Sequence, residues 1–168
     1  MQRKLTHKTT TKMNKFFFAI AVLFLSLTAA QAQPYRAAIG LEGGWPGNLG
    51  LTYKQFTGPS NFFDYKVNLS LSSEHLSLYV TDTFDWNVPI AGGFQFFYGL
   101  GAGAGATFAS HTHFLAAVFG NIGFEYAFSK IPFALSIDYN PGLYMNVANG
   151  FSAGFGYTDA NVGLKFTF

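Results

Sequence analysis

The sequence contains no cysteine. Disulfide bonds, thiolate zinc sites and cysteine nucleophiles all require that side chain, so each of them is excluded. The anchor of a bacterial lipoprotein is excluded as well, because its lipid is attached to a cysteine that follows the signal sequence. Any chemistry of this chain must therefore come from other side chains.

Charged residues are also scarce. Asp, Glu, Lys and Arg make up 11% of the chain, whereas soluble domains average about 25%. Hydrophobic residues reach 49% and aromatic residues 19%, yet beyond Thr28 no apolar run approaches the roughly 20 residues of a membrane-spanning helix. Apolar residues that are abundant but dispersed are typical of the alternating strands of a membrane β-barrel.

The first 32 residues have the three parts of a secretory signal peptide. Residues 1–15 are basic and contain no acid, Phe16–Thr28 is apolar, and Ala30 and Ala32 form a small-x-small cleavage site. Met13 is an alternative start, because the leader is complete from there. An uncleaved anchor is disfavoured by the short apolar core. We therefore predict a signal peptide over residues 1–32 and one domain over residues 33–168.

The basic character of the whole chain comes from this leader. It holds five of the ten basic residues and none of the eight acidic ones. Its removal leaves five basic residues against eight acidic ones, a net charge of −3. Because nucleic-acid binding needs a basic surface, the mature chain is not expected to bind nucleic acid.

The dominant pattern of the mature chain is an alternation of apolar and polar residues, which places them on opposite faces of a strand. In Thr158–Phe168, for example, Val162, Leu164 and Phe166 alternate with Gly163 and Lys165. We predict strands over the following eight segments: Ala37–Glu42, Leu49–Phe56, Phe63–Leu71, His75–Thr81, Phe94–Ala106, Phe114–Phe128, Phe133–Asn140 and Thr158–Phe168.

Turn residues separate these segments, with the longest predicted turns over Asn87–Gly93 and Asn140–Gly154. Eight strands suit a small barrel, whereas a wide porin needs about twice as many. The predicted fold is all-β: a closed, antiparallel, up-and-down transmembrane β-barrel of about eight strands.

The few strand charges decide which face points outward. They are too few to solvate the outside of a soluble ligand-binding barrel, which remains the architectural alternative. In a lipid-embedded barrel they would be paired inside a packed lumen. We therefore predict a polar lumen network formed by the following residues: Glu42, Lys54, Asp64, Lys66, Glu125, Asp138 and Lys165.

The C-terminal strand carries an apolar alternation that ends on an aromatic residue: Leu164, Phe166 and Phe168. This ending is similar to the signal read by the outer-membrane barrel assembly machinery. The predicted partners are therefore that machinery and outer-membrane lipid. Tyrosines and tryptophans near the expected strand ends, Tyr35 and Trp86 among them, are expected to form interfacial girdles.

Five segments together resemble a family of small, uncharacterised outer-membrane barrels from Bacteroidota: Gly50–Phe56, Phe96–Gly101, Gly123–Tyr126, Ile131–Pro141 and Gly163–Phe168. The resemblance spans most of the mature chain but includes no catalytic motif. It implies a barrel fold and an outer-membrane location, and it implies no activity.

Candidate catalytic and metal-binding residues are few. The Ser73-Glu74-His75 stretch and the Ser110-His111 pair contain the residue types of an acyl hydrolase, but adjacency in sequence is not the geometry in which a base reaches a nucleophile. His111 and His113 fall short of the three or four protein ligands of a zinc site. We expect no enzyme activity, no metal site and no cofactor.

The run Gly99-Leu-Gly-Ala-Gly-Ala-Gly105 formally contains a nucleotide-binding glycine pattern, but no helix is expected after it. Its alternate glycines instead leave one face of a strand bare, which gives room either to bulky lumen side chains or to a tight strand crossing. The expected function is that of a structural or surface-interaction barrel in the outer membrane with a filled lumen. A membrane-embedded lipid acyl hydrolase, a narrow channel and a soluble periplasmic ligand-binding barrel are the alternatives.

Overall fold

The computed structural model describes residues 35–168 except for residues 46, 73–74 and 148–150. These residues form one closed barrel of eight antiparallel strands in up-and-down order, which confirms the predicted all-β fold. Among them no helix is long and apolar enough to cross a membrane. The strands are β1 (Ala37–Trp45), β2 (Asn48–Phe56), β3 (Asn61–Leu71), β4 (Leu76–Ala91), β5 (Phe94–Phe108), β6 (Thr112–Ala127), β7 (Phe133–Val147) and β8 (Phe151–Thr167).

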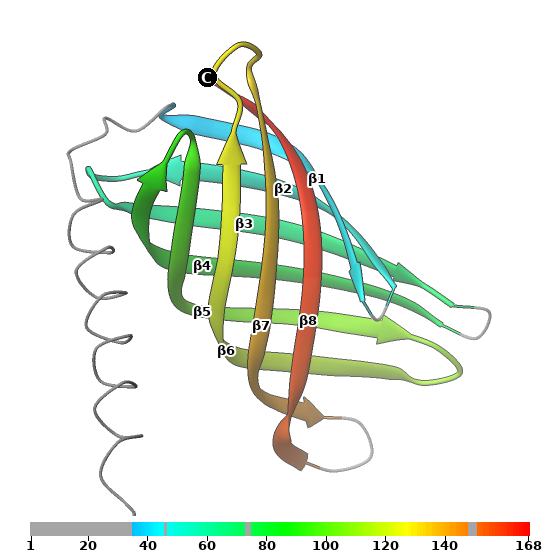
Figure 1. Ribbon diagram of the computed structural model, residues 1–168. Coiled ribbons are helices and arrows are strands. Elements are labelled where there is room, and N and C mark those ends of the chain that lie inside the picture. Colours follow the sequence, from blue (N-terminus) through cyan, green and yellow to red (C-terminus); the bar gives the residue numbers. More distant parts are fainter. Residues whose placement is uncertain (1–34, 46, 73–74, 148–150) are drawn as a thin grey trace, which may run out of the picture. The chain divides into compact units, whose positions relative to one another are not determined.

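Each strand pairs with its neighbours in the chain, and the first pairs with the last. Figure 1 shows the strands in this order, with β8 in red lying beside β1 in blue. The closing register places Leu41 opposite Leu164 and Trp45 opposite Ala160. Closure leaves no unpaired strand edge, so the backbone donors and acceptors of the sheet are satisfied within the barrel.

The barrel wall is polar inside and apolar outside. In β8, Asn161 and Lys165 are buried, whereas the alternate residues Val162, Leu164 and Phe166 are about half exposed. Successive side chains of a strand point to opposite faces, so this alternation assigns the first set to the lumen and the second to the outer surface. The same division holds in β2 and β3. This arrangement is the reverse of a soluble protein core.

Aromatic rings form contacts from strand to strand over the outer surface. Phe63 on β3 contacts Phe84 on β4, and Trp86 on β4 stacks on Tyr98 of β5. Phe96 on β5 then contacts Phe124 on β6. Among the residues expected in the girdles, Tyr35 was assigned to the wrong face. It is buried inside the barrel because its hydroxyl finds a carboxylate partner there.

Two predicted turns are wrong. Asn87–Gly93 is not a long turn, because β4 continues to Ala91 and passes Pro89 with a shift in register. Only Gly92 and Gly93 form the turn, and their φ angles of 59° and 93° suit the two-residue hairpin that needs positive φ at both positions.

The second wrong turn is Asn140–Gly154. Strand β7 continues through Pro141 to Val147, and β8 begins at Phe151. The pairing shifts between Gly142 and Leu143, which is how the ladder accommodates a proline that cannot donate a hydrogen bond. Pro141 and Gly142 are turn residues in most contexts, and the neighbouring strand overrides that preference here.

The glycines of β5 give room to aromatic side chains, as their spacing predicts. A Cβ added at Gly101 would lie 2.5 Å from Cε2 of Phe119, and one at Gly105 would lie 2.9 Å from Cε1 of Tyr79. Rings contributed by β6 and β4 thus occupy the space that side chains on the inner face of β5 would need. The glycine pattern is therefore a packing feature of the lumen.

Gly101→Val is expected to lower the free energy of unfolding by about 1–3 kcal/mol, because the new side chain would overpack the space next to Phe119. Gly120→Val is the matched control, since Gly120 shares the outer face of β6 with Val118 and a Cβ there has no neighbour closer than 3.9 Å. Urea titration of both refolded variants measures the difference. Equal losses in the two variants would contradict this account of the glycines.

Candidate functional site in the barrel lumen

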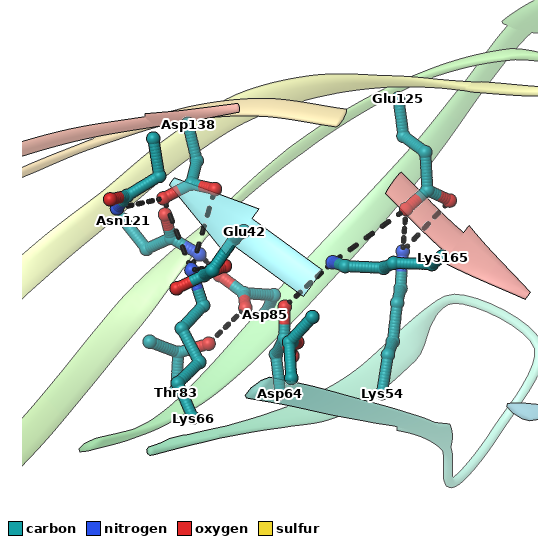
Figure 2. Close-up of polar contacts among 12 residues, drawn as sticks. Glu42, Lys54, Asp64, Lys66, Thr83, Asp85, Asn121, Glu125, Asp138 and Lys165 are labelled. Carbon is teal, nitrogen blue, oxygen red and sulfur yellow. Dashed lines mark hydrogen bonds and ion pairs between the residues drawn. The ribbon is translucent and has the colours of Figure 1, made fainter. Parts of the chain in front are cut away.

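The polar side chains of the lumen come from the inward positions of the strands. The structure buries all seven residues of the network expected from the sequence: Glu42, Lys54, Asp64, Lys66, Glu125, Asp138 and Lys165. They come from β1, β2, β3, β6, β7 and β8, so barrel closure is what brings them together. Figure 2 shows how their charged ends point toward one another.

Lys54 and Glu125 form a buried ion pair. Nζ of Lys54 lies 3.1 Å from each carboxylate oxygen of Glu125, and neither side chain is exposed to solvent. The Tyr35 hydroxyl donates a hydrogen bond to the same carboxylate. Burial raises the pKa of Tyr35 well above its ordinary value, so the phenol stays protonated and remains a donor.

Aromatic rings surround the same ammonium group. Nζ of Lys54 lies 3.8 Å from the ring centre of Phe62 and 5.0 Å from that of Phe56, with Tyr35 and Phe97 at 5.6 Å and 5.4 Å. The negative faces of aromatic rings attract cations, most strongly where water is excluded. The rings and the carboxylate together compensate for part of the cost of burying a lysine.

Two further lysines link the remaining acids. Nζ of Lys165 lies 2.9 Å from Asp64 and 4.0 Å from Glu125, which joins it to the Lys54 pair. Nζ of Lys66 lies 3.0 Å from Glu42 and 3.2 Å from Asp138. Each lysine in this network contacts at least one acid, which is the condition under which buried charges are tolerated.

A directional chain of asparagine side chains extends this network. The amide nitrogen of Asn161 donates to Asn140, that of Asn140 donates to Asn121, and that of Asn121 donates to Asp85. The Thr83 hydroxyl donates to the other oxygen of Asp85 at 2.5 Å (Figure 2). The chain therefore ends on a carboxylate that is held by neutral donors.

Sequence reasoning missed Asp85 as a lumen residue. The predicted strand ended at Thr81 and a turn was expected from Asn87, so Asp85 fell between two elements. A signal was nevertheless present, since Thr83 and Asp85 alternate with apolar Phe84 and Trp86. The period-two pattern of β4 thus continues beyond Thr81. The predicted strand is too short because the turn residues from Asn87 onward were given too much weight.

Acids outnumber lysines in this part of the barrel. Among the residues that the structure describes, five acids and three lysines are buried: Glu42, Asp64, Asp85, Glu125 and Asp138, and Lys54, Lys66 and Lys165. No group of three or more Asp, Glu, His or Cys side chains within the described ranges has the arrangement of a metal site. The described lumen is therefore an acidic, hydrogen-bonded interior.

Known protein families do not match this chain, and no curated protein matches it. The geometry of the lumen and of the outer surface is therefore the basis for any assignment. The lysines and carboxylates of the lumen pair with one another inside the barrel.

The described candidate hydrolase residues, His75, Ser110 and His111, lie at the barrel end that carries the β3–β4 and β5–β6 turns. Residues 73–74 are outside the described residues. His75, Ser110 and His111 are exposed in the turns, while His113 faces inward on β6 and is partly buried. The structure gives no contact that joins these side chains into a nucleophile–base pair.

The remaining predicted residues fall into two groups. Leu164, Phe166 and Phe168 are exposed on the outer surface at the C-terminal end of the chain. Ala30 and Ala32 lie outside the described residues, as does the whole of the predicted signal peptide. The described C-terminal residues thus lie on the outer surface of the barrel.

Proposed function

We propose that this chain is an outer-membrane β-barrel protein with a structural or surface-interaction role and a lumen filled by its own side chains. One observation carries the proposal: the charged residues of the strands lie inside, and the large apolar residues lie outside. Leu41, Leu51 and Leu100 are 57%, 58% and 67% exposed, whereas Lys54 and Lys165 are almost completely buried. Hydrocarbon is the environment in which this arrangement has the lower free energy.

The outer face of the strands carries one charged side chain. Asp82 shares that face with Val80 and Trp86, while the flanking Thr81 and Thr83 are buried. It is the only Asp, Glu, Lys or Arg on the outer face of the described strands. A barrel surrounded by water would need many charges there, because they keep the surface solvated and free of large apolar patches.

The proposed lumen has no open path from one end of the barrel to the other. An eight-stranded barrel is only wide enough for side chains to fill its interior. Here the ion pairs of three lysines and the rings around Lys54 occupy that space. The proposal assigns the barrel no channel, no catalytic role and no nucleic-acid partner. Its expected partners are outer-membrane lipid and, during biogenesis, the barrel assembly machinery.

Gel mobility tests the membrane assignment. The mature chain, refolded in detergent, is expected to migrate faster before heating than after boiling, because a closed membrane barrel resists unfolding in unheated detergent. The same protein transferred to buffer without detergent is expected to aggregate, since its exposed surface is apolar. A monodisperse protein in plain buffer would favour a soluble barrel and overturn the proposal.

A further inference from the structure

Glycines surround one carboxylate on the lumen wall. Glu42 on β1 is paired with Gly163 on β8 and with Gly50 on β2, and Gly44 is the next inward residue on its own strand. Beyond these glycines stand polar residues: Ser136 is paired with Gly163, and Asn68 with Gly50. Because Gly50 and Gly163 have no side chains, Asn68 and Ser136 can approach Glu42 across them.

Asn68 and Ser136 approach Glu42 from opposite sides. A Cβ added at Gly50 would collide with Oδ1 of Asn68 and would lie 3.2 Å from Cγ of Glu42. A Cβ added at Gly163 would lie 2.7 Å from Oγ of Ser136 and 3.6 Å from Cβ of Glu42. Both side chains are at least nine-tenths buried, and neither Oδ1 of Asn68 nor Oγ of Ser136 has a hydrogen-bond partner.

Two more amide oxygens lie beside Gly44, the next inward residue after Glu42 on β1. A Cβ at Gly44 would collide with Oδ1 of Asn161 and would lie 2.9 Å from Oδ1 of Asn48. Neither oxygen accepts a hydrogen bond, and Oε1 of Glu42 accepts none either. A buried oxygen without a donor costs about 1–3 kcal/mol, so several of them on one stretch of wall require an explanation.

Rotating the amides of Asn161 and Asn48 does not remove the problem. The amide nitrogen of Asn161 already donates to Asp138 and Asn140, and that of Asn48 donates to Asp159. Exchanging nitrogen and oxygen would place acceptors against these acceptors. The oxygens of both residues are therefore held toward the space over Gly44.

From this geometry we infer that the lumen binds a hard metal cation, of the calcium class, between Glu42 and the oxygens of Asn48, Asn68, Ser136 and Asn161. Calcium accepts mixed sets of carboxylate, amide and water oxygens with flexible geometry. The excess of buried acids over lysines favours a cation in the same interior. The cation site depends on the barrel fold and not on the proposed membrane location. A negative result for one therefore does not overturn the other.

Its affinity is expected to be low. Glu42 supplies the one carboxylate oxygen without a partner, since its Oε2 lies 3.0 Å from Lys66. Calcium sites with few charged ligands bind with dissociation constants of about 10⁻⁴–10⁻³ M. Such a site is filled where calcium is abundant, as it is outside cells.

Calcium binding to the refolded mature chain in detergent micelles tests the site, with terbium as a luminescent substitute of similar ligand preference. Terbium emission is expected to saturate, calcium is expected to displace it, and the midpoint of thermal unfolding is expected to be higher in calcium than in EDTA.

Glu42→Gln and Asn68→Ala are each expected to weaken calcium binding at least tenfold. Asn87→Ala is the matched control, because Asn87 is also a buried lumen asparagine whose Oδ1 lacks a partner. It lies on β4 near the β4–β5 turn, at the other end of the barrel from Glu42. This variant should bind as the wild type does. If the folded wild type binds neither ion, or if all three variants bind alike, the lumen holds water only at this point and the inference is wrong.

Discussion

Replacing Lys54 with alanine is expected to lower the free energy of unfolding by about 3–5 kcal/mol, the usual cost of removing one partner from a buried ion pair. The change leaves the carboxylate of Glu125 without the ammonium group that lies 3.1 Å from both of its oxygens. Lys165 compensates little, since its Nζ is 4.0 Å away and is already bonded to Asp64. Urea titration in phosphatidylcholine vesicles, followed by tryptophan fluorescence, measures the loss.

Two further variants test whether the loss of stability comes from breaking the Lys54–Glu125 ion pair or only from removing a lysine. Lys130→Ala removes a lysine from the exposed β6–β7 turn and is expected to change stability by no more than about 0.5 kcal/mol. The double variant Lys54→Met with Glu125→Leu removes both charges and is expected to recover most of the loss, because no charge is then left unpaired. A Lys54→Ala variant as stable as Lys130→Ala would mean that this interior is not dry.

The inward and outward sides of the strands could be read from the sequence. Period-two alternation is local, so Lys165 could be placed opposite to Leu164 and Phe166 without knowledge of any partner strand. The scarcity of charge then decided which set faces inward. For the same reason Lys54 and Glu125 could be assigned to the lumen, although they lie on strands far apart in the chain.

Pairing within the lumen could not be read in the same way. Lys54 and Glu125 are 71 residues apart, and which acid meets which lysine depends on the stagger of eight strands around the closed barrel. That stagger is a property of the whole sheet. The site around Glu42 has the same origin, because Asn68 and Asn161 approach it only after β1 has paired with both β2 and β8.

The errors in the sequence analysis arose where local preference and sheet pairing disagree. Pro89 and Pro141 indicate turns by themselves, yet both lie within long strands at shifts of register. A proline is tolerated in a strand where the ladder is irregular. Because such irregularities depend on the neighbouring strand, the single sequence could not reveal them. Asp85 differs, since its alternation with Phe84 and Trp86 was visible in the sequence but lay outside the predicted strand.

Leu51→Arg is expected to lower the free energy of unfolding by about 2–4 kcal/mol in lipid vesicles, the cost of a cation near the middle of the hydrocarbon layer. Leu51 lies on the outer face of β2, and its cross-strand partners Leu41 and Val67 are exposed there as well. Arginine at this position would replace contacts with lipid by a desolvated charge. The same urea titration measures the effect.

Leu71→Arg is the control for depth, because Leu71 is the last residue of β3 and is also exposed. Near the interface the same substitution is expected to cost only about 0–1 kcal/mol. Asp82→Leu makes the opposite change and is expected to stabilise the barrel, since it removes the one outward charge of the described strands. In a water-soluble barrel the order would be reversed: arginine at Leu51 would be harmless, and leucine at Asp82 would enlarge an exposed apolar surface.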